Sequence, residues 1–206
     1  MDKYCLICMK KIKIQGFNQL LFNHPICHDC FLKMNRDVKI VKINGIKVLS
    51  LFKYKDMMVN LIYQYKACND IVLSSVFLSY DLLYLRLVFK GFYIVPVPSY
   101  IDHDIKRGFN HVKEIFKHLN LPIIDFLKKE KDFKQSSLSY KERKKSVSNI
   151  NKNANISLKD KKILLVDDIL TTGFTLKRCI ELILKENPET LKVVVICCSS
   201  SKRVEY

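Results

Sequence analysis

Short apolar runs alternate along this chain with longer segments that have apolar residues at helical spacing. The apolar runs are typical of buried parallel strands and lie at residues 92–97, 163–166 and 191–197. The helical pattern occupies residues 57–89, with a break near 67–70, and then residues 110–119 and 175–186. Residues 39–50 alternate between polar and apolar positions, and Asn44-Gly45 in their middle predicts a hairpin turn. Strands that alternate with helices predict an α/β fold with a mostly parallel sheet flanked by helices.

The most apolar stretch, residues 71–89, is interrupted by Asp81 and Arg86. These charges favour a core helix over a membrane span, so we expect no span. No apolar segment precedes the first cysteine pair, so we also expect no signal peptide and a cytoplasmic location.

Composition fits one ordinary domain with a small appendage, since the chain has 206 residues of which 49% are hydrophobic. The formal charge is +16, and residues 128–162 hold twelve Lys and Arg against four Asp and Glu, a local balance of +8. This concentration favours phosphate-rich partners, including nucleic acid. A solvated, lysine-rich loop is the alternative, and charge alone does not choose between the two.

Four cysteines form two pairs, Cys5-x2-Cys8 and Cys27-x2-Cys30, with eighteen residues between them. Two such pairs at this spacing predict a tetrahedral zinc site, because each turn presents two thiolates to one point. Disulfides are disfavoured in a cytosolic chain, and no strand precedes the pairs as in a thioredoxin-like redox site. We therefore predict a structural zinc that stabilises the fold without chemistry of its own.

Two histidines lie close to the cysteine pairs in the sequence, and four further cysteines lie elsewhere in the chain. His24 and His28 are alternative ligands, but four cysteines suffice, so we expect both histidines beside the site or on the surface. The remaining cysteines stand in apolar contexts and are expected in the core: Cys68, Cys179, Cys197 and Cys198.

The strongest candidate for a ligand site follows the apolar run 163–166. Asp167 and Asp168 come directly after it, and adjacent carboxylates there suit the vicinal hydroxyls of a ribose. A Thr/Gly-rich turn then opens a helix, whose free N–H groups favour a phosphate. The residues of this turn are Thr171, Thr172, Gly173, Phe174 and Thr175.

This segment resembles the 13-residue signature for phosphoribosyl pyrophosphate (PRPP) of type I phosphoribosyltransferases. Further motifs stand in the order seen in ComF-type competence proteins: Tyr65-Lys66, Val95-Pro96-Val97-Pro98, Arg107-Gly108-Phe109-Asn110, and Gln135 followed by Leu138 and Arg143. The resemblance implies a zinc-binding module over residues 1–38. It implies a type I phosphoribosyltransferase-like domain over residues 39–206, with a basic loop region at 126–162. The implied role is natural transformation, in which imported single-stranded DNA is put to use.

The resemblance also implies the parts of a PRPP site. Asp167 and Asp168 would hold the ribose, and residues 171–175 the 5′-phosphate. Candidates for pyrophosphate are Lys66, Ser99, Tyr100 and Arg107. Mg²⁺ would accompany PRPP, and no residue stands out as a catalytic base. Two of these cations have alternative roles. Lys66 is alternatively a solvated lysine, and Arg107 alternatively forms an ion pair that anchors its loop.

The chain departs from the family pattern at several positions, which keeps two functions open. His103 lies between Asp102 and Asp104 where a basic residue is usual, His111 replaces a Gln, and Phe174 replaces a small residue. In one reading the protein is a PRPP-dependent transferase. In the other it is a nucleotide-sensing or DNA-handling module without turnover. Candidate partners are single-stranded DNA and a competence helicase or another DNA-uptake protein.

Overall fold

A five-stranded sheet forms the centre of the described part of the chain. The computed structural model describes residues 3–12, 24–129 and 149–199. The strand order across the sheet is β1 (Arg36–Ile43), β2 (Ile46–Lys53), β7 (Thr190–Cys198), β6 (Lys162–Leu170) and β3 (Tyr93–Pro96). The four strands from β2 to β3 are parallel, and β1 alone pairs antiparallel, with β2. The prediction of an α/β fold with a mostly parallel sheet is therefore confirmed.

The predicted hairpin is the β1–β2 pair. Its turn is Asn44-Gly45, and both residues have positive φ, of 48° and 74°. Two consecutive left-handed residues match the right-handed twist of the flanking strands, which explains the Asn-Gly sequence.

Helices fill the segments where helical spacing was predicted. Residues 57–89 form α3 (Met57–Ala67), the 3₁₀ helix η1 (Ile71–Ser75) and α4 (Leu82–Val88). The later elements of this type are α6 (His111–Phe116), η2 (Lys117–Leu119) and α8 (Phe174–Leu184). Two short helices that the spacing did not predict are α2 (His28–Lys33) and α5 (Ile101–Arg107). None of the helices in the described ranges has the length and apolarity to cross a membrane.

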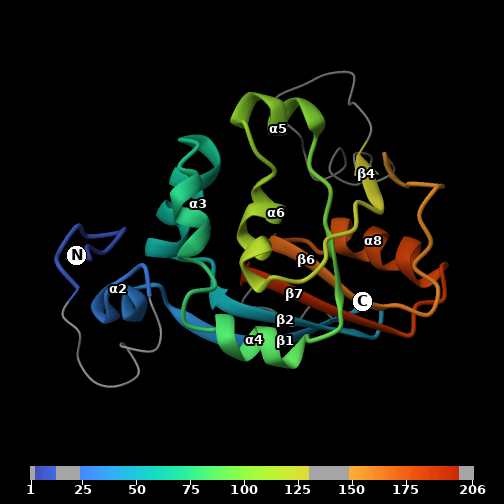
Figure 1. Cartoon of the computed structure of the whole chain (residues 1–206), viewed down its shortest axis with the longest axis horizontal. Coiled ribbons are helices and arrows are strands. Elements are labelled where there is room, and N and C mark those ends of the chain that lie inside the picture. Colours follow the sequence, from blue (N-terminus) through green and yellow to red (C-terminus); the bar gives the residue numbers. More distant parts are fainter. Residues whose placement is uncertain (1–2, 13–23, 130–148, 200–206) are drawn as a thin grey trace.

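A second, two-stranded sheet stands beside the main one. It pairs β4 (Leu127–Lys129) antiparallel with β5 (Ile150–Lys152), and residues 130–148 between them lie outside the described residues. The middle of the basic region, with Gln135, Leu138 and Arg143, falls in that gap. Figure 1 shows β4 near α8, and α2 beside α3 and α4 at the other end of the molecule.

The main sheet has a separate hydrophobic core on each face. Leu164 and Val166 of β6 belong to the core beneath α3 and α6. Ile163 and Leu165 face the opposite core, which the apolar face of α8 covers. Because side chains alternate along a strand, the two acids that follow are directed to different faces.

The four-cysteine unit is continuous with the first of these cores. Cys5, Ile26 and Met34 are buried in the same cluster as residues of β2 and α3. The ring of Phe31 stacks on Tyr80 with 3.8 Å between centroids. The N-terminal unit thus contributes to the core of the whole fold.

The four other cysteines do not all behave as predicted. Cys179, Cys197 and Cys198 are buried, as expected from their apolar surroundings. Cys68 is exposed, so its predicted core position is wrong. Its place just past the last turn of α3, where the chain leaves the core, accounts for the difference.

Candidate functional site

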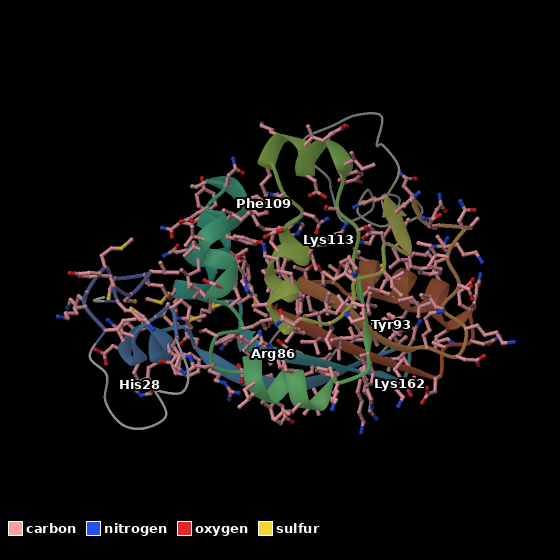
Figure 2. The ribbon with its side chains drawn as sticks, in the orientation of Figure 1. His28, Arg86, Tyr93, Phe109, Lys113 and Lys162 are labelled. Carbon is pink, nitrogen blue, oxygen red and sulfur yellow. The ribbon has the colours of Figure 1, made fainter. Side chains whose placement is uncertain are left out.

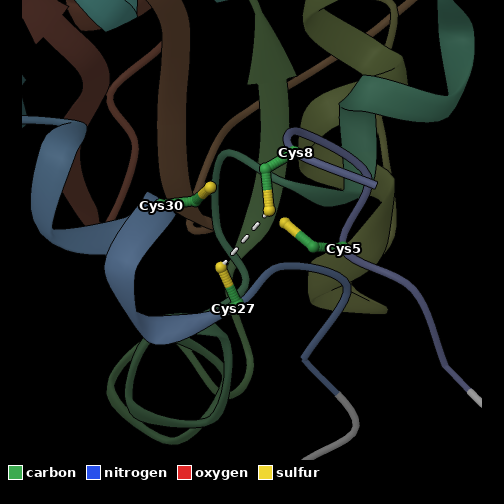
Figure 3. Close-up of side chains that lie close together, drawn as sticks. All are labelled: Cys5, Cys8, Cys27 and Cys30. Carbon is green, nitrogen blue, oxygen red and sulfur yellow. Dashed lines mark hydrogen bonds between the residues drawn. The ribbon is translucent and has the colours of Figure 1, made fainter. Parts of the chain in front are cut away.

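The four predicted zinc ligands converge on one point. Their sulfur atoms all lie within 4.8 Å of one another, and Figure 3 shows the side chains directed toward a common centre. Cys8 Sγ and Cys27 Sγ are 3.8 Å apart. A tetrahedral site with Zn–S bonds of about 2.3 Å requires sulfur–sulfur distances of about 3.8 Å. All four are free thiols, so the donor set and its spacing fit zinc.

Local structure explains this convergence. A bridge between Tyr4 and Lys11 closes the turn that carries the first cysteine pair. Cys27 is the N-cap of α2 and Cys30 lies in its first turn, so the helix start sets the spacing of the second pair.

Both nearby histidines have other contacts. The His24 ring stacks on Tyr80 with 4.1 Å between centroids, and its Nδ1 lies 3.1 Å from the Ser79 carbonyl oxygen. The His28 ring lies 6.5 Å from Phe31. Within the described residues, the potential metal cluster consists of the four cysteines alone.

The two acids of the candidate ribose site lie inside strand β6, not after its end. The sequence suggested a strand over 163–166, but β6 continues to Leu170 because its pairing with β7 continues to Leu170↔Cys198. On its other side, β3 pairs with β6 only as far as Pro96↔Val166. The acids therefore follow the point where β6 loses one of its two neighbours, a place where ligands bind in parallel sheets.

Asp168 is the centre of a buried charged cluster. Lys66 Nζ of α3 lies 2.5 Å from Asp168 Oδ2, and His111 Nε2 of α6 lies 3.4 Å from the same oxygen. Burial alone would raise the pKa of Asp168, but the charge of Lys66 and the contact with His111 bring it below the ordinary value. Asp168 is thus ionised at neutral pH. Lys66 is half-buried, and its ammonium group is paired with Asp168.

Asp167 is directed to the other face of the sheet, and its pKa is shifted in the opposite direction to that of Asp168. Its Oδ1 accepts a hydrogen bond from the Asp168 backbone N–H at 2.9 Å. Burial, and then the charge of Asp168, raise the pKa of Asp167 to about 8. The pKa values of the two carboxyls are therefore shifted in opposite directions, a separation typical of functional carboxyl pairs.

The predicted phosphate turn leads into α8. Gly173 has φ of 78°, and a Cβ there would lie 3.3 Å from Ile43 Cδ1. Glycine is required at this position by the left-handed backbone, and it brings the chain round to the helix start. Thr171 is exposed, while Thr172, Phe174 and Thr175 are half-buried around the N-terminus of α8.

The candidate pyrophosphate segment is held by its own hydrogen bonds. Asp104 Oδ2 accepts from Ser99 Oγ at 2.5 Å and from Asn110 Nδ2 at 2.7 Å. Asn110 Oδ1 accepts from the Lys113 backbone N–H and so caps α6, whose start lies between the labelled Phe109 and Lys113 in Figure 2. The acid at 104 therefore shapes the segment from within.

Arg107 joins this segment to the acid pair. Its Nε donates to the Lys66 carbonyl oxygen at 3.0 Å, and its Nη1 lies 3.1 Å from His111 Nδ1. Nη1 is also 3.5 Å from Asp104 Oδ1. The anchoring role, the alternative for Arg107, describes its contacts in this structure.

Tyr100 is a predicted site residue, and His111 joins the site without having been predicted there. Tyr100 contacts Lys129, whose Nζ lies 3.9 Å from the centre of its ring. His111 was noted only as a departure from the family pattern, yet it contacts both Asp168 and Arg107. A histidine that directly follows a helix N-cap, close to a run of site residues, was the available signal.

Comparisons with known proteins find phosphoribosyl transferases. The family model for the phosphoribosyl transferase domain matches residues 105–206. Hypoxanthine phosphoribosyltransferase from Staphylococcus aureus is similar in structure, with 18% identity and a TM-score of 0.40 over 63% of this chain and 65% of that one. A hypoxanthine-guanine phosphoribosyltransferase from Bacillus anthracis gives 15% identity and a TM-score of 0.41 over 74% and 78% of the two chains.

Two curated relatives carry competence names. Competence protein ComFC of Streptococcus pneumoniae is 29% identical over 166 residues, which cover 81% of this chain and 72% of the relative. Competence protein F of Haemophilus influenzae is 29% identical over 111 residues, 48% of this chain and 47% of the relative. With the four-cysteine cluster and the phosphoribosyl transferase match, these relatives make the chain similar to ComF-type competence proteins.

Proposed function

We propose that the protein binds PRPP at the carboxyl end of β6. Asp167 and Asp168 would accept hydrogen bonds from the ribose hydroxyls, and the turn at 171–175 would hold the 5′-phosphate at the start of α8. The observation that carries the proposal is the pairing of a half-buried and a buried acid with a glycine-capped helix start, at the point where β3 ends. Helix N-termini favour phosphate through their free N–H groups and dipole.

Lys66, which pairs with Asp168, and Arg107, which contacts Lys66, would bind the pyrophosphate group. Lys66 and Arg107 are joined by the bond from Arg107 Nε to the Lys66 carbonyl oxygen. Both cations are paired within the chain, so pyrophosphate would compete with carboxylates for them. Mg²⁺ bound to the pyrophosphate would neutralise part of its charge.

We place this activity in natural transformation, on the strength of the relatives' names. The protein would act in the cytoplasm on imported single-stranded DNA, together with a competence helicase or another DNA-uptake protein. The phosphoribosyl transferase match and the names of the relatives support this role.

Binding without turnover is the second candidate function. It is favoured by the internal engagement of Asp104, Arg107 and Lys66, which leaves the cations of the site already paired. Release of pyrophosphate from PRPP in the presence of candidate acceptors distinguishes the two functions. Steady release supports the transferase, and saturable binding without release supports the sensing or DNA-handling module.

PRPP with Mg²⁺ is expected to raise the melting temperature of the protein. A ligand at 100 times its Kd adds about 2.7 kcal/mol, because it binds only the native state. For a chain of this size that corresponds to roughly 5–10 °C. The Asp167→Asn plus Asp168→Asn variant should lose the shift in differential scanning fluorimetry.

The control variants account for the pairing of Lys66 with Asp168. Losing Asp168 leaves Lys66 without its carboxylate, so Lys66→Met plus Asp168→Asn provides an uncharged companion variant. Asp37→Asn, on β1 away from the site, is the matched control and should keep the full shift. An undiminished shift in the Asp167→Asn plus Asp168→Asn variant would place the ribose elsewhere.

Single-stranded DNA is the proposed ligand of the basic region 128–162. Because each neutralised phosphate releases counterions, log affinity should fall with log salt at a slope of about −0.7 per contact. Changing Lys141, Arg143, Lys144 and Lys145 to Ala should flatten that slope by nearly three units if all four make contacts. Fluorescence anisotropy at several salt concentrations measures the slope. If the variant loses PRPP affinity instead, the region contacts PRPP. If the unmodified protein does not bind DNA at low salt, the DNA proposal is refuted.

A further inference from the structure

We propose that His111 is the positioning residue of the candidate site: as a neutral imidazole with its proton on Nε2, it holds Asp168 and Arg107 in fixed relation. The effect on ligand affinity rests on the proposed PRPP function. The state of the imidazole does not, and it can be measured without any ligand.

The geometry places His111 between two elements that approach β6 from different directions. It is the first residue of α6 and is 8% exposed. Its Nδ1 lies 3.1 Å from Nη1 of Arg107 at the end of α5, and its Nε2 lies 3.4 Å from Oδ2 of Asp168. Tyr65 Oη donates to the His111 carbonyl oxygen at 2.7 Å and fixes its backbone from α3.

Hydrogen-bond chemistry decides which nitrogen holds the proton. A guanidinium has five N–H donors and no acceptor, so Nδ1 of His111 must accept from Arg107. A neutral imidazole with a lone pair on Nδ1 carries its proton on Nε2. Nε2 lies 3.4 Å from Asp168 Oδ2, a buried carboxylate oxygen that can only accept and that has no geometrically ideal hydrogen-bond partner, so a proton on Nε2 is the electrostatically favoured arrangement.

The surrounding charges keep the ring neutral. The groups that face it are Asp168 on β6, Lys66 on α3, and Arg107 and Asp104 on α5. Burial lowers the pKa of His111 to about 4, the two cations add to the effect, and the two carboxylates oppose it. A protonated ring would present an N–H to Arg107 and lose the bond that joins α5 to the acid pair.

The consequence is a series of contacts that runs from strand β6 to helix α5. Its members are Asp168, His111, Arg107 and Asp104. Asp104 in turn holds Ser99 and Asn110. Through this series of contacts, His111 fixes the position of residues 99–107 relative to Asp167 and Asp168. A glutamine at 111 offers one acceptor and one donor and can replace both contacts, whereas leucine offers neither.

The state of the imidazole can be tested by ¹⁵N NMR of histidine-labelled full-length protein. His111 is assigned by the signal lost in His111→Gln, against His24, His28, His103 and His118. We expect a single tautomer with the proton on Nε2 from pH 8 down to at least pH 5. Arg107→Met should raise the pH at which His111 titrates by about one unit or more, because it removes a facing cation. A proton on Nδ1, a charged ring at pH 7 or an unmoved titration would overturn the proposal.

Ligand affinity then tests the positioning role. In calorimetric titrations with PRPP and Mg²⁺, His111→Leu should weaken binding at least tenfold, and His111→Gln should stay within about threefold of the unmodified protein. Equal affinity in the leucine variant would refute positioning. If His111→Leu does not fold, the glutamine variant and the Arg107→Met titration decide. If the unmodified protein does not bind PRPP, the proposed function fails, while the tautomer and titration results still decide the imidazole's role.

Discussion

Replacing Cys27 with serine is expected to remove most of the zinc from the protein and to lower its melting temperature sharply. The unmodified chain should hold about one zinc ion per chain through Cys5, Cys8, Cys27 and Cys30. A unit of roughly thirty residues buries too little surface to fold alone, and metal binding in such units contributes about 10–16 kcal/mol. Metal analysis after extensive dialysis, paired with calorimetry, measures both effects.

The destabilisation should reach beyond the N-terminal unit. Cys30 and Met34 are buried in the core that α3 and η1 share, and Phe31 stacks on Tyr80. Arg36, at the start of β1, forms an ion pair with the largely buried Asp81. Loss of the metal therefore exposes part of the main core, and the whole transition should shift to lower temperature.

Cys68→Ser is a matched control for this experiment. Cys68 is exposed and lies outside the four-cysteine cluster, so the same chemical change should leave zinc content and melting unchanged. Full metal content with an unchanged melt in Cys27→Ser would refute the zinc assignment.

Features that depend on neighbouring residues could be predicted from the sequence. The cysteine pairs and the turn at 171–175 are encoded by short spacings, and the Asn44-Gly45 turn by two residues that tolerate positive φ. The order of the main-sheet strands and of the longer helices follows from periodicity, which is also a local property. These features are present in the structure where the sequence places them.

Contacts between distant elements could not be predicted in this way. The bond between Lys66 and Asp168 joins α3 to β6, a hundred residues apart, and no local pattern specifies it. The extension of β6 past Val166 depends on β7 running alongside to Cys198. His111 acquires its contacts only because α5 and α6 meet above Asp168.

Lys66→Met is expected to destabilise the protein by about 3 kcal/mol, because it leaves the buried Asp168 carboxylate without its closest cation. This value is at the low end for a buried pair, since the Lys66 side chain is 29% exposed. For a chain of about 200 residues, the melting temperature should fall by roughly 6–12 °C. Adding Asp168→Asn to Lys66→Met should recover most of the loss, because the pair is then replaced by uncharged groups.

The difference between the unmodified protein and Lys66→Met should also depend on pH. The pKa of Asp168 is lowered by Lys66, so the stabilisation is present above the ordinary aspartate value of 3.8 and is lost as pH falls through the lower, folded value. The pKa of Lys66 is raised by Asp168, so the stabilisation is present below 10.5 and is lost as pH rises through the higher, folded value. Urea unfolding should show a constant difference from about pH 5 to 9 and a smaller one at strongly acid or alkaline pH. Lys90→Met, at an exposed position, is the control and should change stability by less than about 0.5 kcal/mol. A Lys66→Met variant as stable as this control at pH 7 would show that the ion pair does not hold α3 to the acid pair.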